Sequence, residues 1–304
     1  MNLLITGAWQ QAKEYIPQIE KKHKVEFLQQ EKENLPCEPS WVEGIIGNGI
    51  FLSHPIEEFT NLQYIQLTSA GFDRVPMAYV KEKGIKINNA RGVYSIPMAE
   101  YALSGVLALY KKQKFFTENQ KTRRWEKERN LLELYGKKVC ILGCGSVGTE
   151  CAMRFEAMGC MVYGIDPVVR EHRSFFSIYH TDDLKYVLER SDVVIITLPL
   201  TEETRGMFDA DVLGAVKTGA VLVNIARGAL IKTEALIDEL KSGRISAVLD
   251  VFEEEPLKED SELWNMDNVI ITPHNSFVGE GNGKRMSDVI IKNLGEYSGR
   301  SPEK

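Results

Sequence analysis

The chain of 304 residues carries 37 Lys and Arg against 43 Asp and Glu, so its formal net charge is −6 at pH 7. Apolar residues make up 43% and charged residues 26%, an ordinary balance for a globular chain, and the length predicts two domains. The acidic charge argues against nucleic acid as a partner. The five cysteines show no CxxC pair and no zinc spacing, which argues against a metal site and a disulfide scaffold. The apolar runs are too short to cross a bilayer, which argues against a membrane protein. We therefore expect a cytoplasmic protein with reduced thiols.

The first third of the chain alternates short apolar runs with helical stretches. Residues 1–7 lack the basic region and cleavage site of a signal peptide and are predicted to begin a first strand. Strands are predicted at residues 3–6, 25–28, 44–47, 63–67 and 85–88, which form five βα units of a flavodoxin-like parallel sheet. The glycines of residues 44–49 are interpreted as a strand end and a loop, because no acidic partner follows them downstream.

A long helix is predicted between two series of strands, from residue 96 to about residue 118. Pro97 stands in the first turn, where a helix tolerates proline. Apolar residues then recur on one face, at Met98, Tyr101, Ala102, Gly105, Val106 and Leu109. Such a helix would act as an interdomain hinge or as a dimer arm.

The second series of strands is long enough for a complete doubly wound sheet. Its strands are predicted at residues 139–142, 162–165, 193–198, 221–225, 247–250 and 269–272, and a closing helix at about 284–297.

A glycine loop follows the first strand of this second series. Gly143, Gly145 and Gly148 form a GxGxxG pattern that opens a helix, and the next strand ends in Asp166. Glycines of this spacing let a pyrophosphate approach helix amides, and the carboxylate would bind the ribose hydroxyls and repel a 2′-phosphate. The loop predicts NAD(H) rather than NADP(H), although Arg170 lies close enough in sequence to accommodate the phosphate. The alternatives are a strand–helix corner with incidental glycines and an S-adenosylmethionine site.

Polar residues follow the last three strands, at the sheet edge where ligands bind in such folds. They are Arg227, a run that contains Asp250 and Glu255, and His274. An arginine can hold the carboxylate of a 2-keto acid, and a histidine can give a proton to its carbonyl oxygen. A carboxylate beside the ring would orient it and favour its acid form. Taken singly, each of these residues has an ordinary structural explanation, so the prediction depends on their shared location.

These blocks resemble the D-isomer-specific 2-hydroxyacid dehydrogenases. The matching segments are residues 143–148 with Asp166, 198–206, 223–228, 249–257 and 272–274, and the likeness extends from about residue 63 to the C-terminus. The resemblance implies a substrate domain of residues 1–96, completed by a C-terminal helix at about 280–304. A Rossmann NAD-binding domain of residues 97–279 would be inserted between these parts. It also implies a homodimer.

The resemblance further implies roles for individual residues. Arg227 would bind substrate, Glu255 would partner the imidazole, and His274 would be the acid/base. The backbone amides of Ser69, Ala70 and Gly71 would hold the substrate carboxylate. The residues expected to contact the cofactor are Gly143, Gly145, Ser146, Val147, Gly148, Asp166, Leu198, Pro199, Thr204, Ala226 and Asp250.

Two departures from the family pattern concern substrate choice. Members that act on 3-phosphoglycerate commonly carry an arginine where this chain has Asn48 and Gly49, so a phosphorylated substrate is disfavoured unless Arg91 substitutes. Tyr94, with Phe72 and Phe277, would line an apolar pocket or serve as core packing.

Together these features predict an NADH-dependent oxidoreductase that interconverts small 2-keto acids and (R)-2-hydroxy acids. Phosphoglycerate dehydrogenase and glyoxylate/hydroxypyruvate reductase are alternatives within the family. An NAD(H)-sensing regulatory protein is the alternative outside enzymology, because the fold does not separate it from an enzyme.

Overall fold

The computed structural model describes residues 1–297 and divides the chain into two compact units. Unit 1 holds Met1–Tyr94 and, within the described part of the chain, residues 279–297, and unit 2 holds Ser95–Val278. The expected boundaries were residues 96/97 and 279/280. The last residues of the predicted C-terminal part, 298–304, lie outside the described residues.

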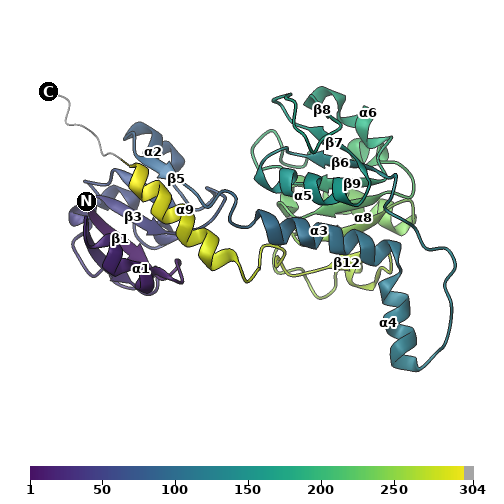
Figure 1. Cartoon of the computed structure of the whole chain (residues 1–304), viewed down its shortest axis with the longest axis horizontal. Helices are drawn as coiled ribbons and strands as arrows, with labels where there is room; N and C mark the ends of the chain where they lie inside the picture. The colour runs from purple at the N-terminus through teal and green to yellow at the C-terminus, as the bar shows by residue number, and fades with distance from the viewer. Residues whose placement is uncertain (298–304) are drawn as a thin grey trace. The chain divides into compact units, whose positions relative to one another are not determined.

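Unit 1 is a parallel sheet covered by helices (Figure 1). Within residues 1–297, its sheet is five-stranded with the order β2-β1-β3-β4-β5. The strands are β1 Asn2–Thr6, β2 Lys24–Leu28, β3 Gly44–Gly47, β4 Tyr64–Leu67 and β5 Lys86–Asn88. The helices are α1 Ala12–Ile19, α2 Met77–Glu82 and α9 Asn282–Glu296. The order places β1 at the switch point and confirms the flavodoxin-like prediction.

Unit 2 is a larger doubly wound sheet of seven parallel strands, in the order β12-β11-β10-β9-β6-β7-β8. Its strands are β6 Lys138–Leu142, β7 Met161–Ile165, β8 Ser177–Tyr179, β9 Val193–Ile196, β10 Val221–Asn224, β11 Ser246–Leu249 and β12 Val269–Ile271. Its helices are α3 Ser95–Tyr110, α4 Gln113–Thr122, α5 Ser146–Ala157, α6 Leu184–Leu188, α7 Ala210–Gly214 and α8 Thr233–Lys241. The Rossmann-type prediction is confirmed. The edge strand β8 is the one strand of this unit that the sequence analysis did not predict.

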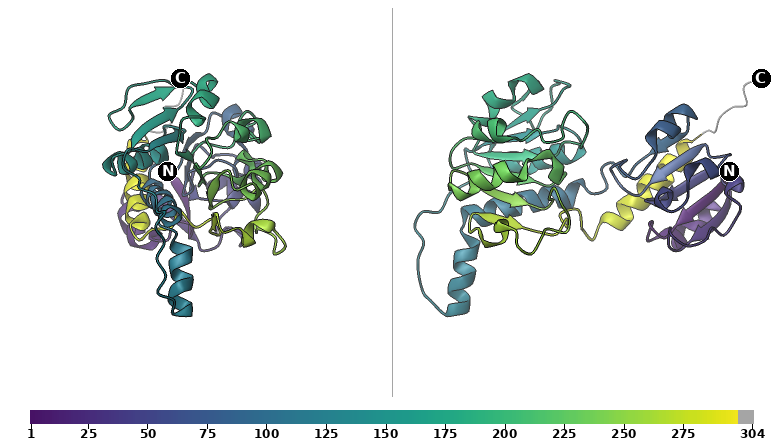
Figure 2. Two further views of the ribbon diagram at one scale, coloured as in Figure 1. Left: turned by 90° about the vertical axis from the view of Figure 1, so that its right-hand side faces the viewer. Right: turned by 180° about the vertical axis from the view of Figure 1, so that it is seen from behind.

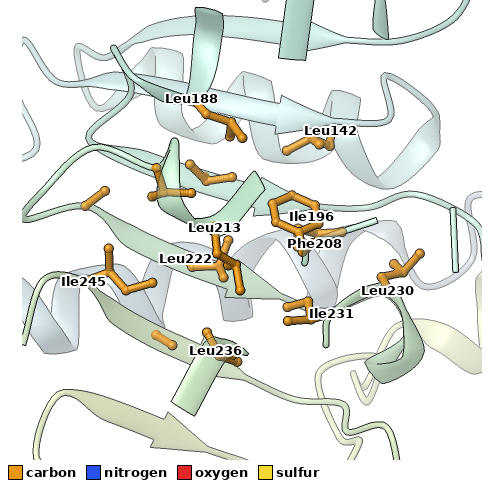
Figure 3. Close-up of a cluster of buried hydrophobic side chains, with 14 of the residues drawn as sticks. Leu142, Leu188, Ile196, Phe208, Leu213, Leu222, Leu230, Ile231, Leu236 and Ile245 are labelled. Carbon is orange, nitrogen blue, oxygen red and sulfur yellow. The ribbon is translucent and has the colours of Figure 1, made fainter. Parts of the chain in front are cut away.

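Apolar side chains fill both faces of the unit 2 sheet. One cluster brings Leu142, Ile196 and Leu222 of the strands against Leu236 of α8 and Phe208 (Figure 3). A second cluster lies under α3 and α5. Burial on both faces explains why the strands are continuous apolar runs rather than alternating ones.

The predicted single helix from residue 96 to 118 is wrong. The chain forms α3 and α4 instead, and Lys112 between them has a φ of 48°, a left-handed conformation that an α-helix does not contain. The side-chain ammonium of Lys114 then donates to the carbonyls of Met266 and Val269, at 3.0 and 2.7 Å. Beyond this anchor, α4 projects from the body of unit 2 (Figure 2).

Candidate active site

The glycine loop joins β6 to α5 at the carboxyl edge of the unit 2 sheet. A Cβ on Gly148 would stand 2.0 Å from the carbonyl oxygen of Gly143, so only glycine lets the helix pack so closely on the strand end. A Cβ on Gly145 would meet nothing within 4 Å. The loop is therefore open at Gly145, which directly precedes the first turn of α5 and the backbone amides of that turn.

Asp166 lies against this loop from the end of β7. Its Oδ2 accepts a hydrogen bond from the amide of Cys144 at 2.9 Å, and its Oδ1 accepts one from Val168 at 2.9 Å. Each oxygen keeps a second lone-pair direction, which suits the two hydroxyls of a ribose. Arg170 also reaches the loop and donates to the carbonyl of Cys144 at 2.6 Å. The open Gly145 and the adjacent carboxylate fit a dinucleotide.

The remaining predicted cofactor residues surround the same edge. Ser146 and Val147 begin α5, and Leu198 is buried after β9. The Thr204 hydroxyl donates to the carbonyl of Pro199 at 2.8 Å and so closes the turn that follows β9.

The carboxylate of Glu255 contacts the imidazole ring of His274 directly. The Oε2 of Glu255 lies 2.8 Å from Nδ1 of His274, and the amide of Phe252 donates to Oε1 of Glu255 at 3.0 Å. The carboxylate is thus held at both oxygens, and it holds one ring nitrogen. With Nδ1 facing Glu255, Nε2 is the ring nitrogen that Glu255 leaves open to another partner. Both side chains are partly exposed.

The loop that carries His274 is built around a fully buried carboxylate. Asp250 has no exposed surface, and its Oδ1 accepts hydrogen bonds from the Thr272 hydroxyl at 2.5 Å and from the Asn275 amide at 2.8 Å. Its Oδ2 accepts one from the Ser276 amide at 2.9 Å, and its carbonyl accepts one from the His274 amide at 2.7 Å. These bonds hold His274 at a φ of 50°. Asp250 was predicted to lie beside the cofactor; in the structure its carboxylate positions the loop that carries His274.

Arg227 is brought to the same edge by the residue that follows it. A Cβ on Gly228 would stand 1.8 Å from the carbonyl carbon of Phe252, so the turn after β10 packs directly on the segment that leads to Glu255. The guanidinium of Arg227 donates to the carbonyl of Ala226 at 2.8 Å. The side chain of Asn224 braces both ends of this turn.

The predicted substrate loop belongs to unit 1 and follows β4. The Ser69 hydroxyl donates to the carbonyl of Gly71 at 3.0 Å, and the side-chain amide of Asn89 donates to the carbonyl of Ala70 at 2.6 Å. Tyr94 donates its hydroxyl to the carbonyl of Thr68 at 2.6 Å, and burial raises the pKa of this phenol.

The three aromatic residues that were considered for an apolar pocket have different surroundings. Phe72 lines a cavity of about 340 Å³ in unit 1, together with polar residues that include Arg91 and Lys292. Phe277 belongs to unit 2 and packs edge-on against the ring of His274, at 6.0 Å between ring centroids.

Sequence reasoning did not identify several supporting residues. Gly228 belongs to the matching segment 223–228, but its packing on Phe252 has no sequence signal. Thr272 was predicted as a strand end and as part of the matching segment 272–274, but its role was not: its hydroxyl links Asp250 to the hydroxyl of Tyr101 in α3, which lies 2.6 Å away. Asn89 follows a strand, which is the one signal that would have pointed to it.

Comparisons with known proteins agree on one family. The model of the D-isomer specific 2-hydroxyacid dehydrogenase NAD-binding domain matches residues 103–276. A D-3-phosphoglycerate dehydrogenase of Methanocaldococcus jannaschii is 34% identical over 79% of this chain and 46% of its own length. Glyoxylate/hydroxypyruvate reductase A HPR2 of Arabidopsis thaliana is 32% identical over 81% of this chain and 79% of its own length. Thus the chain matches about half the length of the first relative and most of the second.

Solved structures support the same assignment over nearly the whole chain. A D-isomer specific 2-hydroxyacid dehydrogenase family protein from Aeromonas salmonicida has a TM-score of 0.81 and 28% sequence identity, and the match covers 96% of this chain and 93% of that one. These likenesses decide against the S-adenosylmethionine alternative. The chain belongs to the D-isomer-specific 2-hydroxyacid dehydrogenase family, and its unit 2 is the NAD-binding domain.

Proposed function

We propose that this protein catalyses the NADH-dependent reduction of small 2-keto acids to (R)-2-hydroxy acids, and the reverse oxidation. The observation that carries the proposal is the 2.8 Å contact between Glu255 and His274, beside the turn that presents Arg227. A guanidinium and a proton donor at one sheet edge are what a keto acid needs, because its carboxylate needs a counter-charge and its carbonyl oxygen needs a proton.

Each residue has a distinct task in the reductive direction. Arg227 binds the carboxylate and polarises the carbonyl of the substrate, and the amides of Ser69–Gly71 hold the second carboxylate oxygen. His274 gives the proton on Nε2 to the carbonyl oxygen, while Glu255 balances the charge of the protonated ring. Bound NADH supplies the hydride that reaches C2. Gly145 and Asp166 hold the pyrophosphate and the ribose, and the carboxylate of Asp166 favours NADH over NADPH.

The test is a substrate panel under both coenzymes. Purified protein with NADH is offered glyoxylate, hydroxypyruvate, pyruvate, phenylpyruvate and 2-ketoisocaproate, and coenzyme absorbance is followed. At least one keto acid should be reduced, faster with NADH than with NADPH. If NADH raises the melting temperature but no keto acid is turned over with either coenzyme, the protein is an NAD(H)-sensing regulator instead.

A homodimer is part of the same proposal. The arm formed by α4 and the following residues exposes Trp125 at 97% of its surface, with Leu132 also exposed, while Lys114 anchors only its base. A projecting arm with an exposed tryptophan is typical of a segment that packs on a second copy. Light scattering after gel filtration should give twice the chain mass, and Trp125→Ala should shift the distribution toward monomer.

A cytoplasmic location completes the proposal. The thiols of Cys140 and Cys151 are buried and free, and burial raises the pKa of both, which suits a compartment where cysteines stay reduced. Within residues 1–297, no helix is long and apolar enough to cross a bilayer.

A further inference from the structure

The carboxyl edge of the unit 1 sheet contains an anion site that the protein fills with its own carboxylate. Glu31 follows β2, and its Oε1 accepts hydrogen bonds from the Asn48 amide at 2.6 Å and the Thr6 hydroxyl at 2.8 Å. Its Oε2 accepts one from the Gly49 amide at 2.7 Å. Successive backbone amides that converge on one anion are a donor set that also binds phosphate. Glu31 therefore occupies, with a negative charge, donors that an anionic ligand would use.

The backbone is shaped to receive this carboxylate. A Cβ on Gly47 would stand 2.6 Å from Oε1 of Glu31 and 3.1 Å from the hydroxyl of Thr6. The β1 strand lies between β2 and β3, so Glu31 reaches from the end of one strand across Thr6 to the end of the other. Because three strand ends share it, the position of the charge is well defined.

The filled site lies next to the predicted substrate loop. The β3 and β4 strands are paired in register at Gly47 and Leu67, and the amide of Thr68 donates to the carbonyl of Gly47 at 2.9 Å. Ser69, the first residue of the substrate loop, follows directly. The charge of Glu31 thus stands at the end of β3, the strand that pairs with the one leading into the substrate loop.

We propose that Glu31 is a specificity-determining residue that restricts the substrate to monoanionic 2-keto acids and rejects acids with a second, phosphate or sulfonate group. The proposal rests on the proposed function. A second anion at this edge would meet a carboxylate where it would need a cation, and the amides of Asn48 and Gly49 are already occupied. Like charges brought together in a recognition site lower affinity strongly.

Arg74 lies near Gly49 and could instead favour a phosphorylated substrate. The Cδ of Arg74 lies 3.5 Å from the place of a Gly49 Cβ, and Arg74 is exposed. If Arg74 rather than Glu31 governed the edge, a phosphorylated substrate would be accepted, and Arg74→Gln would remove that activity.

The experiment compares hydroxypyruvate with 3-phosphohydroxypyruvate, which differ by the phosphate alone. With NADH, the kcat/KM of the wild-type protein for hydroxypyruvate should be at least 100-fold higher than its kcat/KM for 3-phosphohydroxypyruvate. Raising the ionic strength should lower this ratio of kcat/KM values, because salt screens the repulsion between Glu31 and the phosphate. Glu31→Gln removes the charge and keeps the shape, and should narrow the ratio at least tenfold through the KM for the phosphorylated acid.

Glu33→Gln is the matched control, because Glu33 is an exposed carboxylate two residues away that should leave the ratio unchanged. Equal use of both acids by the wild type would overturn the proposal, as would an unchanged ratio in folded Glu31→Gln. If that variant does not fold, the ionic-strength series on the wild type decides. Reduction of neither acid, nor of any other keto acid, would overturn the proposed function rather than the role of Glu31.

Discussion

Two glycine-rich strand ends, residues 47–49 in unit 1 and 143–148 in unit 2, look alike in sequence and differ in what meets their backbone. At Gly145 the space is open, and the neighbouring carboxylate of Asp166 leaves the middle of the loop accessible. At Asn48 and Gly49 the amides are bound by Glu31. The difference shows that glycine spacing alone does not leave backbone amides accessible, because a side chain that follows another strand can already bind them.

The largest expected effect is on the proton transfer that we propose for His274 of unit 2. His274→Gln removes the proton donor and should lower kcat for keto-acid reduction by roughly 10²–10⁴-fold. NADH affinity, followed by fluorescence titration, should stay close to wild type. The control is His180→Gln, since His180 also lies 3.0 Å from a carboxylate, that of Asp182, but at an exposed surface. Full activity in His274→Gln would refute the assignment.

Two alanine substitutions in the glycine loop of unit 2, Gly148→Ala and Gly145→Ala, test which part of the loop is packed and which is open. Gly148→Ala would force a Cβ against the carbonyl of Gly143, so it should cost about 1–3 kcal/mol of unfolding free energy and also weaken NADH binding. Gly145→Ala meets no protein atom and should change stability by less than about 0.5 kcal/mol, while its methyl group still obstructs the pyrophosphate. Denaturant melts and NADH titrations separate the two. Equal stability losses would mean that the loop is not packed as described.

The carboxylate beside the open loop should set the coenzyme preference. Asp166→Ser removes the charge that opposes a 2′-phosphate, and Arg170 is already at the loop to pair with it. The ratio of kcat/KM for NADH over NADPH should fall by about 10–100-fold. Asp182→Asn, an exposed carboxylate of the same unit, serves as control. A preference that does not move would assign the selection to another residue.

The smallest expected effect is on the free energy of unfolding, to which Asp192 contributes by binding a backbone amide away from the site. Asp192 accepts hydrogen bonds from the Lys138 amide at 2.9 Å and the Lys217 ammonium at 2.7 Å. Burial disfavours its charge, but these two partners outweigh burial and lower its pKa below the unfolded value. Its contribution is therefore present above the unfolded pKa and lost as the pH falls through the folded one. Asp192→Asn should cost about 1 kcal/mol at pH 7, less at acidic pH, and leave kcat unchanged.

Much of the fold was predictable because buried parallel strands are apolar runs bounded by turns. The break at Lys112 was not, since its left-handed conformation has no signal in the local sequence and the contacts around it involve residues far along the chain, such as Val269. The residues proposed for the chemistry stand directly after strands and were predicted by position. Glu31 was not predictable in this way, because its partners lie at the ends of neighbouring strands and it precedes residues 44–49 in the chain, whereas the acidic partner of a cofactor loop follows the loop.

The two units also differ in how their chain is made. Unit 2 is one continuous stretch, whereas unit 1 needs α9, whose Met286, Ile290 and Leu294 fill its core and whose Ser287 accepts a hydrogen bond from the Trp9 indole at 3.0 Å. During synthesis the inserted nucleotide domain can fold while the earlier part still lacks its last helix. The nascent amino-terminal region therefore keeps an apolar surface uncovered until α9 has been synthesised, and it is the part on which a chaperone would act.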